Sequence, residues 1–251
     1  MLTQERYDRI LTLLIEKKSI TVNELVEALD TSESTIRRDL NNLDKKNYLK
    51  KVHGGAVLVE NDFSNIEYNV IEKARVNTFE KKKIASYAAS LIKKDDFVFI
   101  DAGTTTDYMV DYITEKGAHY VTNGIIHGKK LAARGFDCII IGGKIKSVTE
   151  AIVGIEAVSN IKRFNFTKGF FGTNALNNVS GYSTPDIEEA LVKEEAIKHS
   201  KKAYVLVDDS KYNKTSSITF GELQDATIIT NKDVGQYNRY TKVIEVIRDD
   251  I

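Results

Sequence analysis

Four polar side chains near the N-terminus have the types and spacing that nucleic-acid recognition needs. They follow the helical pattern i, i+3, i+4, i+7, and they are Ser34, Arg37, Arg38 and Asn41. Arginine can bond guanine through two hydrogen bonds, and asparagine can pair with adenine. The hydroxyls of Ser32 and Thr35 can contact a base or a phosphate. A solvated helix face is the alternative explanation of the same pattern.

The segment behind this face adds positive charge. NYLKKVHGGAVL predicts two short strands, 48–52 and 56–58, turned at Gly54-Gly55. This hairpin carries Lys50, Lys51 and His53, of which His53 either contacts a phosphate or only suits the turn. From residue 37 to 51 the net charge is +4, whereas the whole chain has 36 Lys and Arg against 36 Asp and Glu. A basic surface must therefore be local, and this is the place for it.

Three short amphipathic helices must hold the polar face in position. The first apolar stripe begins at Tyr7, and the second runs from Val22 to Leu29. Thr21 and Glu24 have the spacing of a capping box at the start of the second helix. The third stripe is Ile36, Leu40 and Leu43, with Ser32 as the expected N-cap. Three helices followed by a hairpin predict a winged helix-turn-helix.

A second set of polar residues follows short apolar runs later in the chain, at FVFI, HYV, CIII, GFF and AYVLV. The set comprises Asp101, Gly103, Thr104, Thr105, Thr106, Asn123, Gly143, Lys144, Asn174, Asp208, Ser210 and Lys211. Apolar runs that alternate with helical stretches predict an α/β domain with a largely parallel sheet, and such sheets bind ligands beyond the carboxyl ends of their strands.

The chemistry of this second set suits a phosphorylated, hydroxyl-rich ligand. Gly103 to Thr106 offers backbone amides at an expected helix start, which favours an anion, although a threonine N-cap after a glycine turn explains it too. Lys144, Lys193 or Lys211 can supply the countercharge. Asp101 would repel a phosphate, so we expect it to accept a sugar hydroxyl.

One more helix start supplies candidates. In GYSTPDIEEALVKEEAI, Thr184 suits the N-cap and the only proline of the chain follows it. Glu189 and Lys193 are four residues apart, so they either form an ordinary helical pair or face the ligand site.

The composition is that of a soluble globular protein, with 251 residues, 42% hydrophobic and 29% charged. We expect a DNA-binding domain at 1–58, a polar linker at 59–76 and a ligand-sensing domain at 77–251. The single cysteine, Cys138, predicts a reduced core thiol. The charged start is no secretory signal, and no apolar run approaches the length of about 20 residues that spans a bilayer. The expected location is the cytoplasm, with no membrane partner.

The stretch SESTIRRDLNNLDKKNYLKKVHGGAV resembles the signature of the DeoR family of bacterial sugar-metabolism regulators. EKKKIASYAASLIKKDDFVFIDAGTTT, VTNG, IIGGKIK and VLVDDSKYN are similar to successive blocks of that family's effector domain. The resemblance implies a fold like ribose-5-phosphate isomerase and glucosamine-6-phosphate deaminase, operator DNA as partner and a sugar phosphate as inducer. It implies no cofactor, and it places the inducer at the second set of residues with Thr184, Glu189 and Lys193.

Residues 145–158, IKSVTEAIVGIEAV, resemble the fructose-operon repressors in particular. That resemblance implies fructose 1-phosphate as the inducer, and the lactose-operon branch, with tagatose 6-phosphate, is the alternative. Two recognition helices must match the spacing of two half-sites, so a homodimer or homotetramer is expected.

Two other functions compete with a ligand-released repressor. A sugar-phosphate isomerase needs a positioned base; Asn174 stands where many family members have aspartate, and an amide takes no proton at neutral pH, although Asp101, Glu189 and Asp208 remain. No nucleophile–base motif is present, and the four histidines are too scattered for a metal site: His53, His119, His127 and His199. An architectural DNA-binding protein would leave the second set of polar residues unexplained. We therefore expect neither a catalytic nor a metal site.

Overall fold

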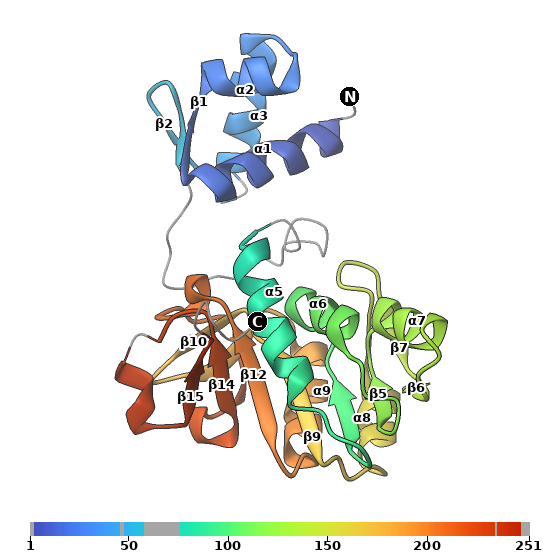
Figure 1. Cartoon of the computed structure of the whole chain (residues 1–251). Coiled ribbons are helices and arrows are strands. Elements are labelled where there is room, and N and C mark those ends of the chain that lie inside the picture. Colours follow the sequence, from blue (N-terminus) through green and yellow to red (C-terminus); the bar gives the residue numbers. More distant parts are fainter. Residues whose placement is uncertain (1–2, 46–47, 58–75, 234, 247–251) are drawn as a thin grey trace. The chain divides into compact units, whose positions relative to one another are not determined.

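The computed structural model describes residues 3–45, 48–57, 76–233 and 235–246. These residues form two compact units, an N-terminal unit and a second unit whose described part begins at Asn77 (Figure 1). Most of the expected linker, residues 58–75, lies outside the described residues. The domain limits 1–58, 59–76 and 77–251 therefore stay a prediction.

In its described residues, the N-terminal unit consists of three helices and a small antiparallel sheet of order β1-β3-β2. Its elements are α1 (Thr3–Lys17), β1 (Ser19–Thr21), α2 (Val22–Leu29), α3 (Glu33–Lys45), β2 (Lys50–Val52) and β3 (Gly55–Val57). Its core gathers apolar side chains of all three helices with Ile20, Leu49 and Ala56 of the sheet region. This is the expected winged helix-turn-helix.

The local signals at the starts of α2 and α3 are confirmed, but the prediction of Thr184 as an N-cap is wrong. The N-cap of α9 (Ile187–Lys198) is Asp186, whose carboxylate accepts from the Glu189 amide, and Thr184 ends strand β11 (Gly181–Thr184). The Thr21 hydroxyl accepts a hydrogen bond from the Glu24 amide, and the Glu24 carboxylate accepts one from the Thr21 amide, which completes the capping box. Ser32 accepts from the Thr35 amide at 3.3 Å and so caps α3. Ile36, Leu40 and Leu43 are all buried.

The wing corrects two details of the sequence interpretation. The turn is at His53-Gly54, with Gly54 at φ +84°, and Gly55 already belongs to β3. A Cβ on Gly55 would lie 2.2 Å from the Ile20 carbonyl oxygen, so this glycine allows β1 to approach. Strand β1 was not predicted, because three residues are too short to show a period.

The second unit contains a seven-stranded parallel sheet of order β15-β14-β12-β9-β4-β5-β6 among the described residues. Its strands are β4 (Phe97–Ile100), β5 (His119–Thr122), β6 (Cys138–Ile140), β9 (Lys168–Gly172), β12 (Ala203–Val207), β14 (Thr227–Thr230) and β15 (Val243–Glu245). The chain winds outward from β4 to β6 and then returns to β9 on the other side of β4. The strand order therefore reverses between β4 and β9, which is where ligands bind in such sheets.

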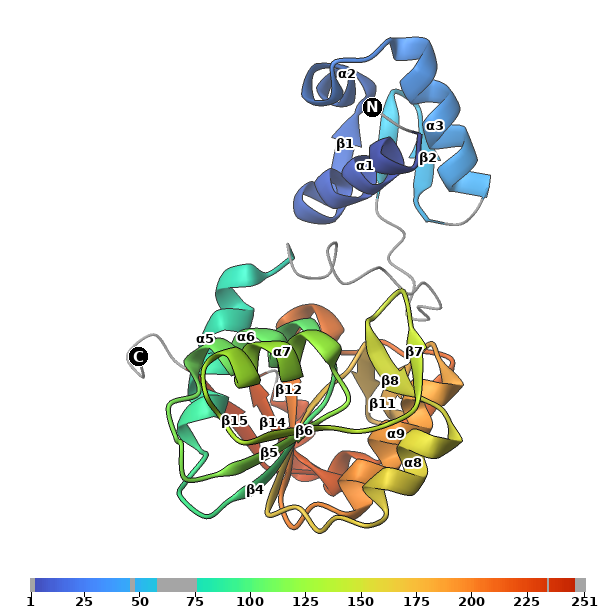
Figure 2. The same cartoon turned by 90° about the vertical axis from the view of Figure 1, so that its right-hand side faces the viewer.

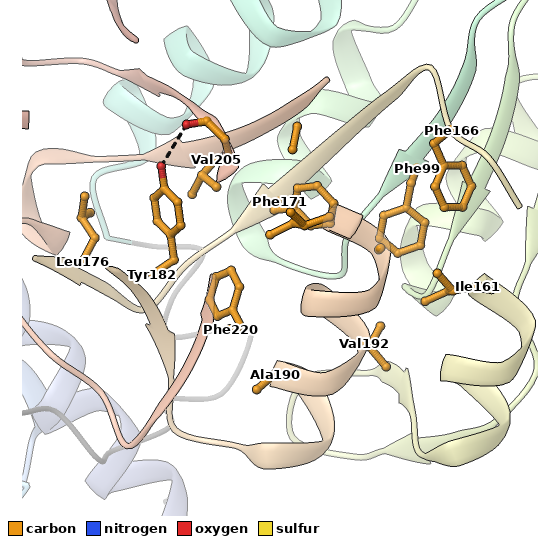
Figure 3. Packing of buried hydrophobic residues seen from close by; sticks show 14 of the residues in the cluster. Phe99, Ile161, Phe166, Phe171, Leu176, Tyr182, Ala190, Val192, Val205 and Phe220 are labelled. Atoms are coloured by element: carbon orange, nitrogen blue, oxygen red, sulfur yellow. Dashed lines mark hydrogen bonds between the residues drawn. The ribbon is translucent and has the colours of Figure 1, made fainter. Parts of the chain in front are cut away.

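Helices cover both faces of this sheet (Figure 2). One core cluster joins a sheet face to α5 (Thr78–Ser90), α6 (Thr104–Tyr112) and α7 (Ile125–Ala133). The other joins the opposite face to α8 (Ile155–Ile161) and α9 (Ile187–Lys198). Figure 3 shows Phe166 next to Phe99 in this second cluster, which also contains Phe171 and Val192 of α9. Burial on both faces explains why the strands read as continuous apolar runs.

Smaller elements complete the second unit. A hairpin forms from β7 (Lys144–Lys146) and β8 (Ala151–Val153), and a three-stranded sheet from β10 (Ala175–Asn177), β11 (Gly181–Thr184) and β13 (Ile218–Gly221). Three short 3-10 helices are η1 (Asp209–Lys211), η2 (Leu223–Asp225) and η3 (Gln236–Arg239).

The structure corrects the prediction for Cys138. Its thiol is only half-buried, because β6 is the edge strand of the large sheet. Burial, with the nearby charge of Asp137, raises its pKa to about 11, so the thiol is protonated at neutral pH. Within the described ranges, no helix is long and apolar enough to cross a membrane.

Candidate DNA interface and ligand site

The predicted recognition face lies on the exposed side of α3. Ser34, Arg37, Arg38 and Asn41 are all exposed, while the apolar stripe of the same helix is buried. Amphipathic periodicity therefore turns these four side chains to solvent together, as the spacing predicted.

The helix entry organises the hydroxyl groups of this face. The Ser32 hydroxyl lies 3.0 Å from that of Ser34 and 2.8 Å from that of Thr35, in addition to capping the helix. Arg37 donates to Glu33 one turn earlier through Nε and Nη2, at 2.8 and 2.6 Å. Such an exposed pair is weak in water and can exchange for a base or a phosphate.

The wing lies beside the recognition helix within the N-terminal unit. Lys51 Nζ donates to the Asn41 side-chain oxygen at 2.6 Å, and the Lys51 amide donates to Asp44 at 3.0 Å. Lys50 and His53 of the wing are exposed. The predicted base-reading and phosphate-binding groups thus share one surface, because α3 and β2 are in contact.

One acidic residue of the Arg-Arg-Asp-Leu motif has a structural role that the sequence did not show. Asp39 is buried and accepts a forked hydrogen bond from Arg6 of α1. This bond is the main cause of the raised pKa of the Arg6 guanidinium. The pair fixes α3 against α1 and leaves the two arginines of the motif exposed.

The second unit holds a buried ion pair at the point where the strand order reverses. Asp101 follows β4, Lys193 lies on α9, and their side chains form a hydrogen-bonded pair with 1% and 5% of the side chains exposed. The amide of Gly172, at the end of β9, donates to the same carboxylate at 3.0 Å. Three elements far apart in sequence therefore meet at Asp101.

Burial and charge act in opposite directions on this carboxyl. Burial raises the pKa of Asp101 above its ordinary value, and the positive charge of Lys193 counteracts that effect. A buried pair of this kind needs both partners, because removal of one leaves an uncompensated charge in the interior.

The expected anion site lies at the start of α6. Gly103 is the N-cap and no side chain caps the helix there. The hydroxyl of Thr106 is used internally, since it donates to the Asp101 carbonyl at 2.6 Å and contacts Nε2 of the buried His127 at 3.1 Å. Thr105 is buried and Thr104 is half-buried, so Thr104 offers the more accessible hydroxyl.

Two asparagines hold the loops around this helix start. Asn123, after β5, accepts from the Ala102 amide at 2.8 Å and fixes the loop that follows β4. Asn174, after β9, accepts from the Thr184 hydroxyl at 3.2 Å. Both amides therefore have structural partners beside the strand ends.

The β7–β8 hairpin is tied to the start of α9 by charges. Lys144 pairs with Glu188 at 2.8 Å, and Lys146 contacts Glu189 at 3.1 Å. The Thr149 hydroxyl donates to the same Glu189 oxygen at 2.6 Å.

The neighbouring glycine admits the hairpin backbone. Gly143 has φ +151°, and a Cβ there would lie 2.7 Å from the Val153 carbonyl oxygen.

A second buried carboxylate lies at the end of β12. Asp208 Oδ1 accepts from the Asn77 side-chain amide at 2.7 Å, from the Ser210 amide at 3.1 Å and from the Ser210 hydroxyl. Burial opposes ionisation of Asp208, and the positive charges of Lys211 and Lys81 act against burial. With the hydrogen bonds they lower the pKa of this carboxyl below its ordinary value.

The structure thus brings most of the predicted ligand residues to one edge of the sheet. Sequence reasoning missed several partners there: Asn77, Lys81, Lys146, Thr149 and Asp186. The block EKKKIA contains Lys81, but three consecutive lysines give no sign that one of them is buried. Within the described ranges, no group of three or more His, Cys, Asp or Glu side chains could hold a metal ion.

Two family models match the chain. Residues 6–62 match a DeoR-like helix-turn-helix domain, and residues 76–232 match a DeoR C-terminal sensor domain. The chain is 40% identical to the Bacillus subtilis uncharacterized HTH-type transcriptional regulator FruR, over 92% of this chain and 91% of that one. It is 34% identical to a Staphylococcus aureus lactose phosphotransferase system repressor, over 90% of both.

Among solved structures, ribose 5-phosphate isomerase A of Methanocaldococcus jannaschii is similar with a TM-score of 0.40. The identity is 12%, and the match covers 54% of this chain and 55% of that one. The assignment of the fold rests on the strand order and the family matches instead.

Proposed function

The chain belongs to the DeoR family of transcriptional regulators, which is not a family of enzymes, and from that premise we propose that it represses an operon for sugar uptake or utilisation. Fructose is the favoured sugar, and fructose 1-phosphate is the favoured inducer. The relative named FruR supports this choice at 40% identity. The lactose phosphotransferase repressors, at 34%, support tagatose 6-phosphate as the alternative.

One observation carries the proposal for the sensor. A helix start without a side-chain cap lies beside a buried carboxylate–lysine pair where the strand order reverses. The backbone amides of the first turn of α6 suit a phosphate, and the carboxylates suit sugar hydroxyls. A sugar phosphate is the ligand class that uses both kinds of group.

We assign the residues accordingly. The phosphate is bound at Gly103 to Thr106 with a lysine as countercharge. The hydroxyls are bound by the carboxylate and amide groups of the same edge. The full set of effector residues is Asp101, Gly103, Thr104, Thr105, Thr106, Asn123, Gly143, Lys144, Asn174, Thr184, Glu189, Lys193, Asp208, Ser210 and Lys211.

The partner of the N-terminal unit is double-stranded operator DNA. The exposed face of α3 enters the major groove and the wing lysines contact phosphates. The full set is Ser32, Ser34, Thr35, Arg37, Arg38, Asn41, Lys50, Lys51 and His53. We place this activity in the bacterial cytoplasm, where the operator is, and in a homodimer or homotetramer, because paired half-sites need paired recognition helices.

The mechanism is a coupling between the two binding events. The inducer favours an arrangement of the DNA-binding units that no longer fits the operator. Couplings of this kind are about 1–3 kcal/mol, which is roughly 5–150-fold in DNA affinity.

A gel-shift titration tests the proposal. The full chain is bound to DNA from its own upstream region and titrated with a panel of sugar phosphates. Release by fructose 1-phosphate alone is expected, and release by tagatose 6-phosphate alone assigns the lactose branch. Consumption of the ligand, or failure to shift DNA at low salt, contradicts a repressor.

A further inference from the structure

Asn77 occupies an unusual position in the second unit. It is the N-cap of α5, and it lies on the chain that comes from the N-terminal unit. Asparagine is among the preferred N-cap residues, because its side-chain oxygen accepts from an amide of the first turn. Here no such cap bond forms. The side chain instead donates to Asp208 Oδ1 at 2.7 Å.

The backbone conformation of Asn77 is consistent with the absence of a cap bond. Its φ and ψ are +51° and +39°, in the left-handed region, whereas an N-cap residue ordinarily has extended backbone. Among non-glycine residues, asparagine adopts the left-handed conformation comparatively readily. The hydrogen bond to Asp208, 131 residues away in the sequence, stabilises that conformation at Asn77.

The partner of Asn77 belongs to the ligand edge of the sheet. Asp208 is 2% exposed, and its Oδ1 already accepts from three donors. Two of these come from Ser210, in the same short helix region, and the third is the Asn77 side-chain amide. A ligand hydroxyl that donates to this oxygen therefore competes with the Asn77 amide.

We propose that the Asn77–Asp208 hydrogen bond is the link through which sugar-phosphate binding acts on the chain that leads to the DNA-binding unit. Without ligand, Asp208 holds Asn77 in the left-handed conformation. With ligand, Asn77 is released, takes the extended backbone of an ordinary N-cap and bonds the first turn of α5. The direction in which the chain enters α5 then changes.

Lys81 takes part in the same link between α5 and Asp208. It is one turn along α5 from Asn77 and only 3% exposed, and its charge acts on Asp208. Its amide donates to the Asn77 carbonyl at 2.9 Å. The start of α5 thus acts on Asp208 through the charge of Lys81 and through the side-chain amide of the N-cap residue Asn77. Asn77 is a positioning residue in this scheme, and it need not touch the ligand.

The inference rests on the proposed function, and two variants test it. Asn77→Ala removes the amide. Asn77→Gly removes it too but tolerates the left-handed backbone, so this variant keeps the fold even where alanine is strained. Asn178→Ala is the control, because Asn178 is an exposed asparagine of the same unit.

The measurement uses the full chain and a labelled duplex from its upstream region. Fluorescence anisotropy gives DNA affinity with and without fructose 1-phosphate, and calorimetry gives the affinity for fructose 1-phosphate alone. Wild type and Asn178→Ala should lose DNA affinity by roughly 5–150-fold on adding the ligand. Both Asn77 variants should lose less than about twofold in DNA affinity when fructose 1-phosphate is added. They should bind fructose 1-phosphate as tightly as wild type or up to about tenfold more tightly, because a competitor for Asp208 is gone.

A merely structural role would weaken ligand binding and leave the coupling in place. If fructose 1-phosphate reduces the DNA affinity of Asn77→Gly by a factor within about twofold of that for wild type, the inference is overturned and the proposed function stays intact. If neither fructose 1-phosphate nor tagatose 6-phosphate changes the DNA affinity of wild type, both the inference and the proposed function are overturned.

Discussion

The two units use their charged residues in opposite ways. In the N-terminal unit the candidate DNA-binding side chains are exposed and lie on one helix and its wing, over a separate apolar core. In the second unit the central carboxylates and Lys193 are buried and hold one another in place. DNA contacts should therefore be removable at little cost in stability, whereas the ligand site is part of what stabilises its unit.

The largest effect should come from Lys193→Met. It leaves the buried Asp101 carboxylate without its partner, and loss of one partner of a buried pair costs about 3–5 kcal/mol. Urea unfolding followed by far-UV circular dichroism measures this loss.

Lys198→Met is the matched control on the same helix. Its exposed pair with Glu194 should change the unfolding free energy by less than about 1 kcal/mol. Equal losses in the two variants would show that burial does not distinguish these pairs.

The next effect concerns pH and the buried His127. Burial lowers its pKa to about 4 from an ordinary value of 6.5. Between these two pH values the unfolded chain therefore binds more protons than the folded chain does. The contribution of His127 to the unfolding free energy is fully present above pH 6.5 and is lost as the pH is lowered toward 4. The loss from this group is up to about 3 kcal/mol.

His127→Gln tests this dependence. The variant should show a shallower fall in unfolding free energy between pH 6.5 and 4 than wild type. Parallel curves would contradict a buried, neutral histidine at this position.

The recognition helix should give a smaller effect, on binding rather than stability. Arg37→Ala and Arg38→Ala should each weaken DNA binding by about 1–3 kcal/mol and change the unfolding free energy by less than about 0.5 kcal/mol. If Arg37 reads a base, its loss relaxes specificity at one position. If Arg38 contacts a phosphate, its loss weakens all sequences alike and lowers the salt dependence.

Anisotropy with operator and scrambled duplexes at several salt concentrations separates these cases. Arg163→Ala, an exposed arginine of the second unit, is the control and should leave DNA binding unchanged. Arginine variants of α3 that unfold the protein would contradict the division between exposed and buried charges.

The smallest effect should come from the cap of α2. Thr21→Ala removes the hydroxyl of the capping box and should cost about 1 kcal/mol, while Asn23→Ala in the same turn should cost less than about 0.5 kcal/mol. Thermal unfolding of the N-terminal unit within the full chain measures both. A larger cost would mean that this unit, too, depends on its polar contacts.

The same contrast explains what the sequence could predict. The capping box and the recognition face are local patterns within four to seven residues, and the structure has both where the spacing placed them. The parallel sheet and its strand ends were also predictable, because buried strands read as apolar runs. The wing turn was displaced by one residue, since Gly55 serves the contact with β1 and not the turn.

The partners within the ligand edge could not be predicted. Asp101 and Lys193 are 92 residues apart, and Asn77 and Asp208 are 131 apart. Nothing in the local pattern distinguishes the buried Lys81 from its exposed neighbour Lys82. Which polar residue meets which is decided by tertiary packing, and the spacing of residues along the chain does not record it.

One measurement tests the central claim most directly. Wild type and Asp208→Asn are bound to the labelled operator duplex and titrated with fructose 1-phosphate. Asp208→Asn should bind the DNA as wild type does, because its amide oxygen can still accept from Asn77, but it loses the carboxylate, so fructose 1-phosphate should release wild type only. Release of both proteins at the same concentration would contradict a ligand site at this edge of the sheet.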